Sequence, residues 1–266
     1  MFDCHIHIMK ETNKEEFYTG VRESGFVGGL LLSRPPRTFD GNSLTTHQRL
    51  ENVMGLAEGM KGLYPFYWID PLEPDACEQV DYGVSLGISG FKIISIDDYP
   101  DNPKAMEVYK RIASHDKPIL FHSGILWNGK NSSNYNRPAN FECLLEVEGL
   151  RFALAHVSWP WHDECLAVFG KFIAAREFGN QNTMYFDLTP GTPEIYRREV
   201  LTKLFQIGYK VDDYILWGTD NCSENYDVEW ARKWQKIDEE IFDELKLTQS
   251  QKDKVYEKNL KNFLIG

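Results

Sequence analysis

Short apolar runs rich in β-branched and aromatic residues recur along the chain, and a longer stretch with helical spacing follows most of them. Eight such runs have the composition of strands, and they begin at Phe2, Gly25, Gly62, Gly87, Pro118, Arg151, Met184 and Tyr214. Most are apolar on both faces, which is typical of parallel strands that helices cover. We therefore predict an α/β fold with eight strands, the number that a (β/α)8 TIM barrel requires.

The helical stretches between these runs have recognisable ends. Several stop at a glycine, and Pro103 and Pro193 stand where a first helical turn would begin. Thr248 and Gln251 form a capping pair ahead of the last apolar pattern, and residues 141–149 are predicted to be helical as well. A doubly wound open sheet is the alternative, but it would usually carry a glycine-rich phosphate loop where this chain has HIHIMK.

Composition narrows the class of protein. The chain has 266 residues, close to the roughly 250 of a barrel, so we expect a single domain over residues 1–266. Its net charge of −11 disfavours nucleic acid as a partner, and its longest apolar run is too short to cross a bilayer of about 30 Å. Five scattered cysteines without a CxxC pair, and no leader segment before the first motif, predict a cytoplasmic protein.

The end of the first predicted strand carries the most distinctive polar residues. Because side chains alternate along a strand, His5 and His7 should both face the mouth of the barrel, as two ligands of one ion would need. Asp3 falls on the same face one step deeper, where it would orient a ligand. Alternation points Cys4 outward, as a small buried apolar residue.

Three more strands end in residues that suit the same site. His122 ends the fifth strand, His156 the sixth and Asp220 the eighth. Three or four imidazoles with one carboxylate are the ligand set of a zinc-like catalytic site. Taken singly, each histidine could be a hydrogen-bonded core residue and the aspartate a turn residue. Their joint placement at the carboxyl ends of barrel strands favours a metal site.

The other polar positions near strand ends allow more than one role. Lys92 lies within the apolar fourth strand, and a buried ammonium costs several kcal/mol, so it either faces the mouth or extends past the rim. At the mouth it would be carboxylated to bridge two ions, or stay an amine that binds substrate. Asp187 faces a similar choice between the site and a structural role. The predicted loops after the strands contain four residues that either contact substrate or are ordinary surface residues: Arg34, Arg137, Trp159 and Trp161.

At these residues the sequence resembles the amidohydrolase superfamily, and within it the amidohydrolase-related group that includes aminocarboxymuconate semialdehyde decarboxylase. DCHIH matches the D-x-H-x-H of this group, and GISGFKIIS is similar to its fourth-strand G-F-K segment. PILFHSG matches P-hydrophobic-H-x-G, and ILWGTDN matches G-[ST]-D. The sixth-strand segment resembles A-H-x-G-x-P, with Ser158 in place of the usual glycine. The matches run the length of the chain in the order of the family.

The resemblance implies a barrel with a divalent metal, usually zinc, held by His5, His7, His122 and Asp220. His156 would be a catalytic histidine beside one ion or a ligand to a second, and Lys92 would then be the carboxylated bridge. Mn²⁺, Fe²⁺ and Ni²⁺ also accept such N/O ligands. His-x-His at residue five is expected to leave no room for the β-sandwich that flanks hydantoinase-like members.

The residues and the resemblance together predict a hydrolase of a small amide, ester or lactone. The ion would acidify a water, Asp220 would accept its proton, and the ion or His156 would stabilise the oxyanion and return a proton to the leaving group. The same site would also suit non-oxidative decarboxylation of an aromatic or dienoic acid, gripped by Arg137 and the region of Trp159 and Trp161.

Two other classes of protein begin from similar features. A TatD-like deoxyribonuclease also starts with D-x-H-x-H, but it has a glutamate at the fourth strand where this chain has Lys92, and the negative charge disfavours DNA. A non-catalytic barrel would close its metal with four protein ligands. The acidic and aromatic stretch 223–242 is expected to cover the mouth or to bind a second subunit in a homodimer.

Overall fold

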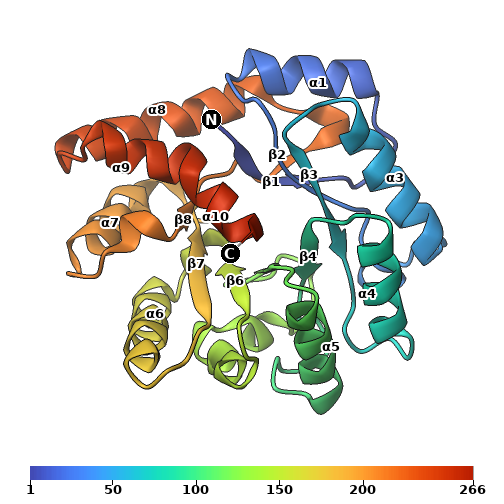
Figure 1. Ribbon diagram of the computed structural model, residues 1–266. Coiled ribbons are helices and arrows are strands. Elements are labelled where there is room, and N and C mark those ends of the chain that lie inside the picture. The colour runs from blue at the N-terminus through green and yellow to red at the C-terminus, as the bar shows by residue number, and fades with distance from the viewer. Residues whose placement is uncertain (266) are drawn as a thin grey trace.

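Nine parallel strands form one continuous sheet in the computed structural model, which describes residues 1–265 (Figure 1). The strands are β1 (Asp3–His7), β2 (Gly29–Leu32), β3 (Leu63–Trp68), β4 (Gly90–Ile93), β5 (Ile119–Phe121), β6 (Arg151–Leu154), β7 (Thr183–Asp187), β8 (Ile215–Leu216) and β9 (Asn221–Cys222). The eight predicted runs coincide with β1 to β8. Each of these strands pairs with the next along the chain, as in a TIM barrel.

The segment from β8 to β9 joins the last strand to the first. Ile215 of β8 pairs with Phe186 of β7, and Asn221 of β9 pairs with Ile6 of β1. Between the two short strands, the Trp217 carbonyl accepts a hydrogen bond of 2.9 Å from the Cys4 N–H. These contacts close the sheet, so the predicted (β/α)8 TIM-barrel fold is confirmed. Every strand pairing in residues 1–265 is parallel, and no β-sandwich accompanies the barrel there.

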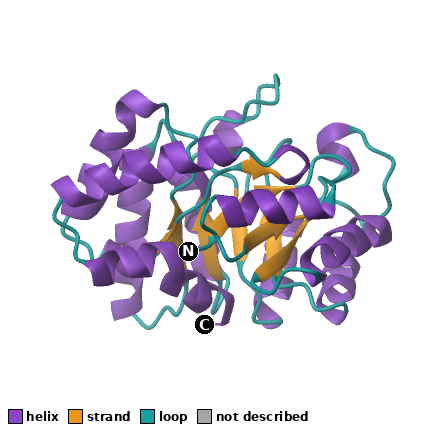
Figure 2. Ribbon diagram, turned by 90° about the horizontal axis from the view of Figure 1, so that it is seen from above, coloured by secondary structure: helices purple, strands orange, loops and turns teal. Residues whose placement is uncertain are grey.

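Helices cover the outside of the sheet, as both views show (Figures 1 and 2). The main ones are α1 (Lys14–Glu23), α3 (Thr46–Glu58), α4 (Ala76–Ser85), α5 (Pro103–Ser114), α6 (His162–Glu177), α7 (Glu194–Gln206) and α8 (Val228–Glu244). A short α2 (Arg37–Asp40) follows β2, and α9 (Gln249–Asp253), a π-helical turn (Lys254–Lys258) and α10 (Asn259–Ile265) end the described chain. The Thr248–Gln251 capping pair is confirmed. No helix within residues 1–265 is both long and apolar enough to cross a membrane.

Two predictions differ from the structure, one of a helix and one of a covering segment. Residues 138–146 form a 3₁₀ helix, because the side-chain amides of Asn182 and Asn180 donate to the carbonyls of Leu144 and Leu145, which an α-helix would need for itself. The stretch expected to cover the mouth instead forms α8 over residues 228–244. This helix contacts α1 on the outside of the barrel and buries Trp234, so covering of the mouth is wrong for these residues.

Apolar side chains pack on both sides of the sheet. One cluster lies between the sheet and the helices, and a second fills the barrel interior with Leu30, Phe66, Leu120 and Tyr185. Phe263 of α10 packs into the interior cluster, and α10 crosses the end of the barrel near the N-terminus (Figure 1). The opposite end, where the strands finish, is left for the site.

Alternation fails in the first half of β1. The register between β1 and β2 shifts between Asp3 and Ile6, as at a β-bulge. Cys4 therefore packs inside the barrel with Leu30 and Leu32, and the prediction that it points outward is wrong, although it is buried as expected. All five cysteines are free, as their scattered spacing predicted.

Candidate metal centre

Three polar atoms, two from β1 and one from the residue just before β9, converge at the mouth of the barrel. The Nε2 atoms of His5 and His7 are 3.1 Å apart, and Asp220 Oδ1 lies 3.5 Å from the first and 3.3 Å from the second. Ligand atoms at about 2.0–2.2 Å from a tetrahedral zinc ion would be separated by similar distances. Asp220 has a left-handed backbone (φ 59°), which aspartate tolerates better than most residues. The donor set therefore fits a divalent cation.

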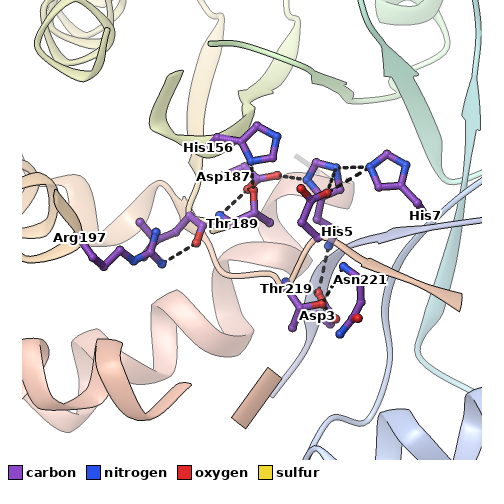
Figure 3. A network of polar contacts seen from close by, with 11 residues as sticks. Asp3, His5, His7, His156, Asp187, Thr189, Arg197, Thr219 and Asn221 are labelled. Carbon is purple, nitrogen blue, oxygen red and sulfur yellow. Dashed lines mark hydrogen bonds and ion pairs between the residues drawn. The ribbon is translucent and has the colours of Figure 1, made fainter. Parts of the chain in front are cut away.

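Asp187 at the end of β7 orients one of these ligands. Its Oδ2 lies 2.6 Å from His5 Nδ1, and both side chains are fully buried (Figure 3). Since an ionised carboxylate only accepts hydrogen bonds, we assign the proton of His5 to Nδ1, which leaves Nε2 with a free lone pair toward the site. Of the two roles considered for Asp187, the structure thus shows the one at the site, because this carboxylate contacts His5.

A hydroxyl extends this arrangement to a second histidine. Thr189 Oγ1 donates to Asp187 Oδ1 over 2.5 Å and lies 2.7 Å from His156 Nδ1 (Figure 3). Because the hydroxyl has given its only proton to the carboxylate, it accepts from His156 Nδ1–H. The neutral His156 ring thus presents an unprotonated Nε2. Arg197 supports the pair, since its guanidinium donates to the intervening Leu188 carbonyl over 2.8 Å.

The backbone around His156 is shaped to place its ring. His156, Val157 and Ser158 all have left-handed φ angles of 44–61°, a conformation that costs roughly 1–2 kcal/mol per residue. Gly191 stands against the ring, and a Cβ there would lie 2.5 Å from His156 Cγ. Gly124 lets the turn after β5 approach the Trp159 carbonyl, which a Cβ would meet at 2.4 Å. Strain and close packing of this kind concentrate at functional sites.

His122 lies in the same cavity but apart from the three converging donors. The group whose ligand atoms all lie within 4.8 Å of one another comprises His5, His7 and Asp220. His122 Nε2 instead lies 3.3 Å from the Ile125 carbonyl, and its ring centroid is 5.2 Å from that of His156. The structure therefore does not bring His122 into the ligand group that the family resemblance implied.

Lys92 faces the cavity rather than the barrel rim. It is only 1% exposed, and its Nζ has no hydrogen-bond partner among the described residues. Burial lowers its pKa to about 8, although Asp187 and Asp220 oppose the shift. The alternative of a lysine that extends past the rim is excluded. This unpartnered buried amine lies beside the donor cluster. It could bind an anionic group of a substrate or, if carboxylated, a second metal ion.

The environment favours the neutral form of His5, His122 and His156 and the ionised form of Asp220. Burial lowers the pKa of His156 to about 4 and also lowers the pKa values of His5 and His122 below the ordinary value. Burial would raise the pKa of Asp220, but His5 and the contact with His7 outweigh it, and the net shift is downward. Neutral imidazole nitrogens and a carboxylate are the protonation states that metal ligation requires.

Asp3 does not orient a histidine ring, contrary to the prediction. Its carboxylate accepts hydrogen bonds from the Thr219 N–H, the Thr219 hydroxyl and the Tyr226 hydroxyl at 2.6–2.8 Å. The bulge in β1 turns it toward the segment that carries Asp220. Asp3 thus ties the strand of the two histidines to the turn of the converging carboxylate.

A cavity of about 450 Å³ opens above these groups. Its polar residues include His5, His7, Lys92, His122, His156 and Asp220, and its apolar residues include Met9, Phe39, Trp68, Ile94, Ile125, Leu126, Trp127, Trp159 and Pro190. Of the predicted substrate contacts, Trp159 lines the cavity. Arg137 does not, because its guanidinium pairs with Glu164 at 2.5 Å and stacks on Trp161. Arg34 is also absent from the lining and lies 3.9 Å from Glu11.

Sequence reasoning underestimated Asp187 and missed Thr189 and Trp68. Asp187 and Thr189 are polar residues two apart at the end of a strand, the same spacing that singled out His5 and His7. This spacing was available as a signal for the hydrogen-bonded chain. The Trp68 ring lies 5.6 Å from the His7 ring, but a tryptophan at the end of an apolar strand resembles any other core residue in the sequence.

No protein-family model and no curated protein matches the sequence significantly. Solved structures do match its fold. A dihydroorotase from Campylobacter jejuni has a TM-score of 0.59 and 11% identity over 98% of this chain and 82% of its own. A protein assigned as a metal-dependent hydrolase from Lactobacillus casei ATCC 334 has a TM-score of 0.57 and 18% identity over 91% and 74%. An amidohydrolase from Burkholderia ambifaria with bound Zn has a TM-score of 0.53 and 13% identity over 91% and 65%.

These similarities define the architecture and not the reaction. All three identities are low, and an N-acetylneuraminate lyase from Mycoplasma synoviae matches the same barrel with a TM-score of 0.51 and 16% identity. Barrels of this kind host many unrelated activities. The residues at the mouth, and not the fold, therefore indicate the class of reaction.

Proposed function

We propose that the protein is a metal-dependent hydrolase of the amidohydrolase type that cleaves a small amide, ester or lactone. The observation that carries this proposal is the convergence of His5 Nε2, His7 Nε2 and Asp220 Oδ1 at 3.1–3.5 Å from one another, at the floor of an open cavity. Three protein donors beside open space are typical of a catalytic metal site, whereas structural sites are closed by four. A non-catalytic barrel is therefore the weaker interpretation.

His5, His7 and Asp220 would hold the ion, with zinc as the first candidate. His122, His156 and Lys92 line the same cavity and are the residues from which further ligands, or those of a second ion, would come. When bound, a divalent ion polarises a carbonyl and makes a water more acidic. The residues present thus fit the cofactor that the sequence predicted.

The side chains around the ion have complementary roles. Asp220 is ionised and partly exposed, so its free oxygen can accept the proton of an attacking water. His156 Nε2 is unprotonated and can take up this proton, and it then delivers it to the departing amine or alcohol. Asp187 and Thr189 keep His156 in the tautomer that this transfer needs. Because the fold holds these groups in place before substrate binds, little conformational entropy is lost in positioning them during the reaction.

Decarboxylation is the less supported use of the same site. That alternative relied on Arg137 to grip a carboxylate, and the Arg137 guanidinium is paired with Glu164 outside the cavity. Trp159 alone of its expected contacts lines the cavity. Incubation with aromatic carboxylates and measurement of released CO₂ separates the two reactions, and we expect none above background.

The proposal is tested with zinc-loaded protein and a panel of small amides, esters and lactones. We expect turnover of at least one of them, its loss on treatment with a chelator and its return with added Zn²⁺. His7→Ala and Asp220→Asn should each abolish turnover while circular dichroism reports an intact fold. Retained turnover in either variant, or turnover that ignores the chelator, would overturn the proposal.

A further inference from the structure

An apolar wall rises directly above the candidate metal centre and is separate from the two cores of the barrel. Trp68, Ile94 and Leu126 are at most 9% exposed and form their own cluster, against which Met9 and Phe39 pack. The Trp68 ring lies 4.7 Å from the Phe39 ring and 5.6 Å from the ring of His7. We call Phe39, Trp68, Ile94 and Leu126 the apolar wall. The wall thus brings apolar surface next to His7, one of the proposed metal ligands.

Two tryptophans continue this surface to the rim of the cavity. The Trp127 ring is 79% exposed and stacks on Trp159, with centroids 6.4 Å apart and planes at 12°. Both line the cavity. The stacked pair extends the apolar surface of the cavity to the solvent, and contiguous exposed apolar surface of this kind often marks a ligand-binding groove.

The charges of the cavity are confined to its floor. Lys92, the imidazoles and Asp220 are its titratable or charged lining groups, together with the thiol of Cys222, and the apolar wall and rim contribute none. Arg34 and Arg137 approach Glu11 and Glu164 and are absent from the lining. A charge on a ligand at the height of the wall would lose water without gaining an oppositely charged partner, which is costly.

We propose that the substrate carries an uncharged, flat apolar group, such as an aromatic ring system, next to the bond that is cleaved. This inference rests on the proposed function. The reacting carbonyl would lie on the polar floor, and the ring would lie along the apolar wall toward Trp127 and Trp159. A cavity of about 450 Å³ is within the range that encloses a small organic ligand.

Calorimetric titration with three amides tests this class of ligand. The probes are 2-naphthamide, acetamide, and 6-carboxy-2-naphthamide, which has the same rings with a charge at the far end. With metal-free protein, which is not expected to cleave the probes, we expect 2-naphthamide to bind at one site at least tenfold more tightly than either of the others. Equal affinity for acetamide, or for the carboxylated ring, would overturn the proposal.

Variants at an exposed position locate the binding without endangering the fold. Trp127→Ala should weaken binding of 2-naphthamide at least fivefold, while Trp127→Phe should retain most of it. Phe178→Ala is the matched control, since Phe178 is 89% exposed and follows α6 at the other end of the barrel. The same loss in the control variant as in Trp127→Ala would contradict binding at the rim.

The outcome separates this inference from the proposed hydrolysis. Selective binding of 2-naphthamide to metal-free protein, with the same dependence on Trp127, would support the wall even if the zinc-loaded protein hydrolysed nothing. Turnover of small amides by the zinc-loaded protein, together with equal binding of the three probes to the metal-free protein, would support the hydrolase but contradict a role of the apolar wall in its specificity.

Discussion

A single carboxylate, Asp187, orients two imidazoles at the mouth of the barrel. It contacts His5 directly at 2.6 Å and reaches His156 through the Thr189 hydroxyl. Partners of this kind fix the tautomer and direction of a ligand or a base, and their removal typically costs ten- to a hundredfold in metal affinity or activity. The hydrogen bond from Asp187 to His5 and the one through Thr189 to His156 can be removed separately by mutation.

Asp187→Asn should weaken zinc binding by about ten- to a hundredfold, because His5 loses the charged partner of its Nδ1–H. Thr189→Val breaks only the branch to His156, so zinc affinity should stay close to that of the parent while turnover falls by about tenfold or more. Competition with a chromogenic chelator measures the affinity. Equal loss of zinc affinity in both variants would contradict the branched arrangement.

Gly191→Ala should impair His156 without unfolding the protein. The added methyl group would lie within 2.5–2.7 Å of the imidazole, which must then move. We expect turnover to fall while the thermal midpoint changes little. Gly55→Ala is the control, since a Cβ there meets nothing within 4 Å and lies within α3, where alanine is favoured over glycine by about 0.5–1 kcal/mol. Full activity of Gly191→Ala would show that the ring position is not critical.

At the scale of single residues, the sequence predicts which groups gather at the mouth better than how each is used. His5 and His7 lie on β1, Asp220 directly precedes β9, and the three converge, as spacing and barrel topology predict. The role of Asp3 was mistaken because a bulge interrupts alternation, and a bulge leaves no clear trace in five residues of strand. Contacts such as Arg137 with Glu164 depend on side-chain directions that spacing does not determine.

The elements follow the apolar pattern closely, and the exceptions have local causes. Strands β1 to β8 were all predicted because parallel strands buried on both faces are nearly continuous apolar runs. The aromatic and acidic residues of the stretch that forms α8 suggest a cover for the mouth or a subunit contact, yet Trp234, Ile241 and Phe242 form the buried face of this helix. The 3₁₀ helix at 138–146 arises from asparagine side chains that are distant in the sequence.

A surface ion pair between α4 and α5 makes a pH-dependent contribution to stability. Arg111 donates two hydrogen bonds of 2.6 Å to Asp81, and His115 approaches it at 2.8 Å. These contacts lower the pKa of Asp81 to about 2. Because the folded pKa lies below the ordinary value of 3.8, the stabilisation is present above about pH 4 and is lost as the pH falls toward about 2.

Asp81→Asn should therefore destabilise the protein at pH 7, by less than about 1 kcal/mol because the pair is exposed and screened by water. The difference from the parent should shrink by roughly half at pH 3. Urea unfolding at pH 7, 4 and 3 measures it. A difference that grows on acidification would have the wrong sign for this pair.

For the whole molecule, the interior core of the barrel depends on α10 as well as on the strands. Phe263 of α10 lies 5.1 Å from Tyr185 and 6.3 Å from Phe66, ring to ring, within the interior cluster. The helix thus seals the end opposite the site. The predicted barrel followed from the count and order of strands, but the apolar pattern after Thr248 does not reveal which surface this helix covers.

Phe263→Ala should destabilise the barrel by about 3–5 kcal/mol, the usual cost of removing a buried phenylalanine side chain. Ile265→Ala, two residues further on and 73% exposed in the parent, should change the free energy of unfolding by less than about 0.5 kcal/mol. Urea denaturation of both variants provides the comparison. Similar stability of the two would mean that α10 is not part of the interior core.

The most direct test of the account is the metal content of purified protein after dialysis against Zn²⁺ and removal of excess ion. Elemental analysis should give one or two equivalents of zinc per chain. His7→Ala and Asp220→Asn should lose at least one equivalent, and His47→Ala, at an exposed position in α3, should lose none. A parent protein without bound metal, or full retention in both site variants, would contradict the claim that these residues form a metal centre.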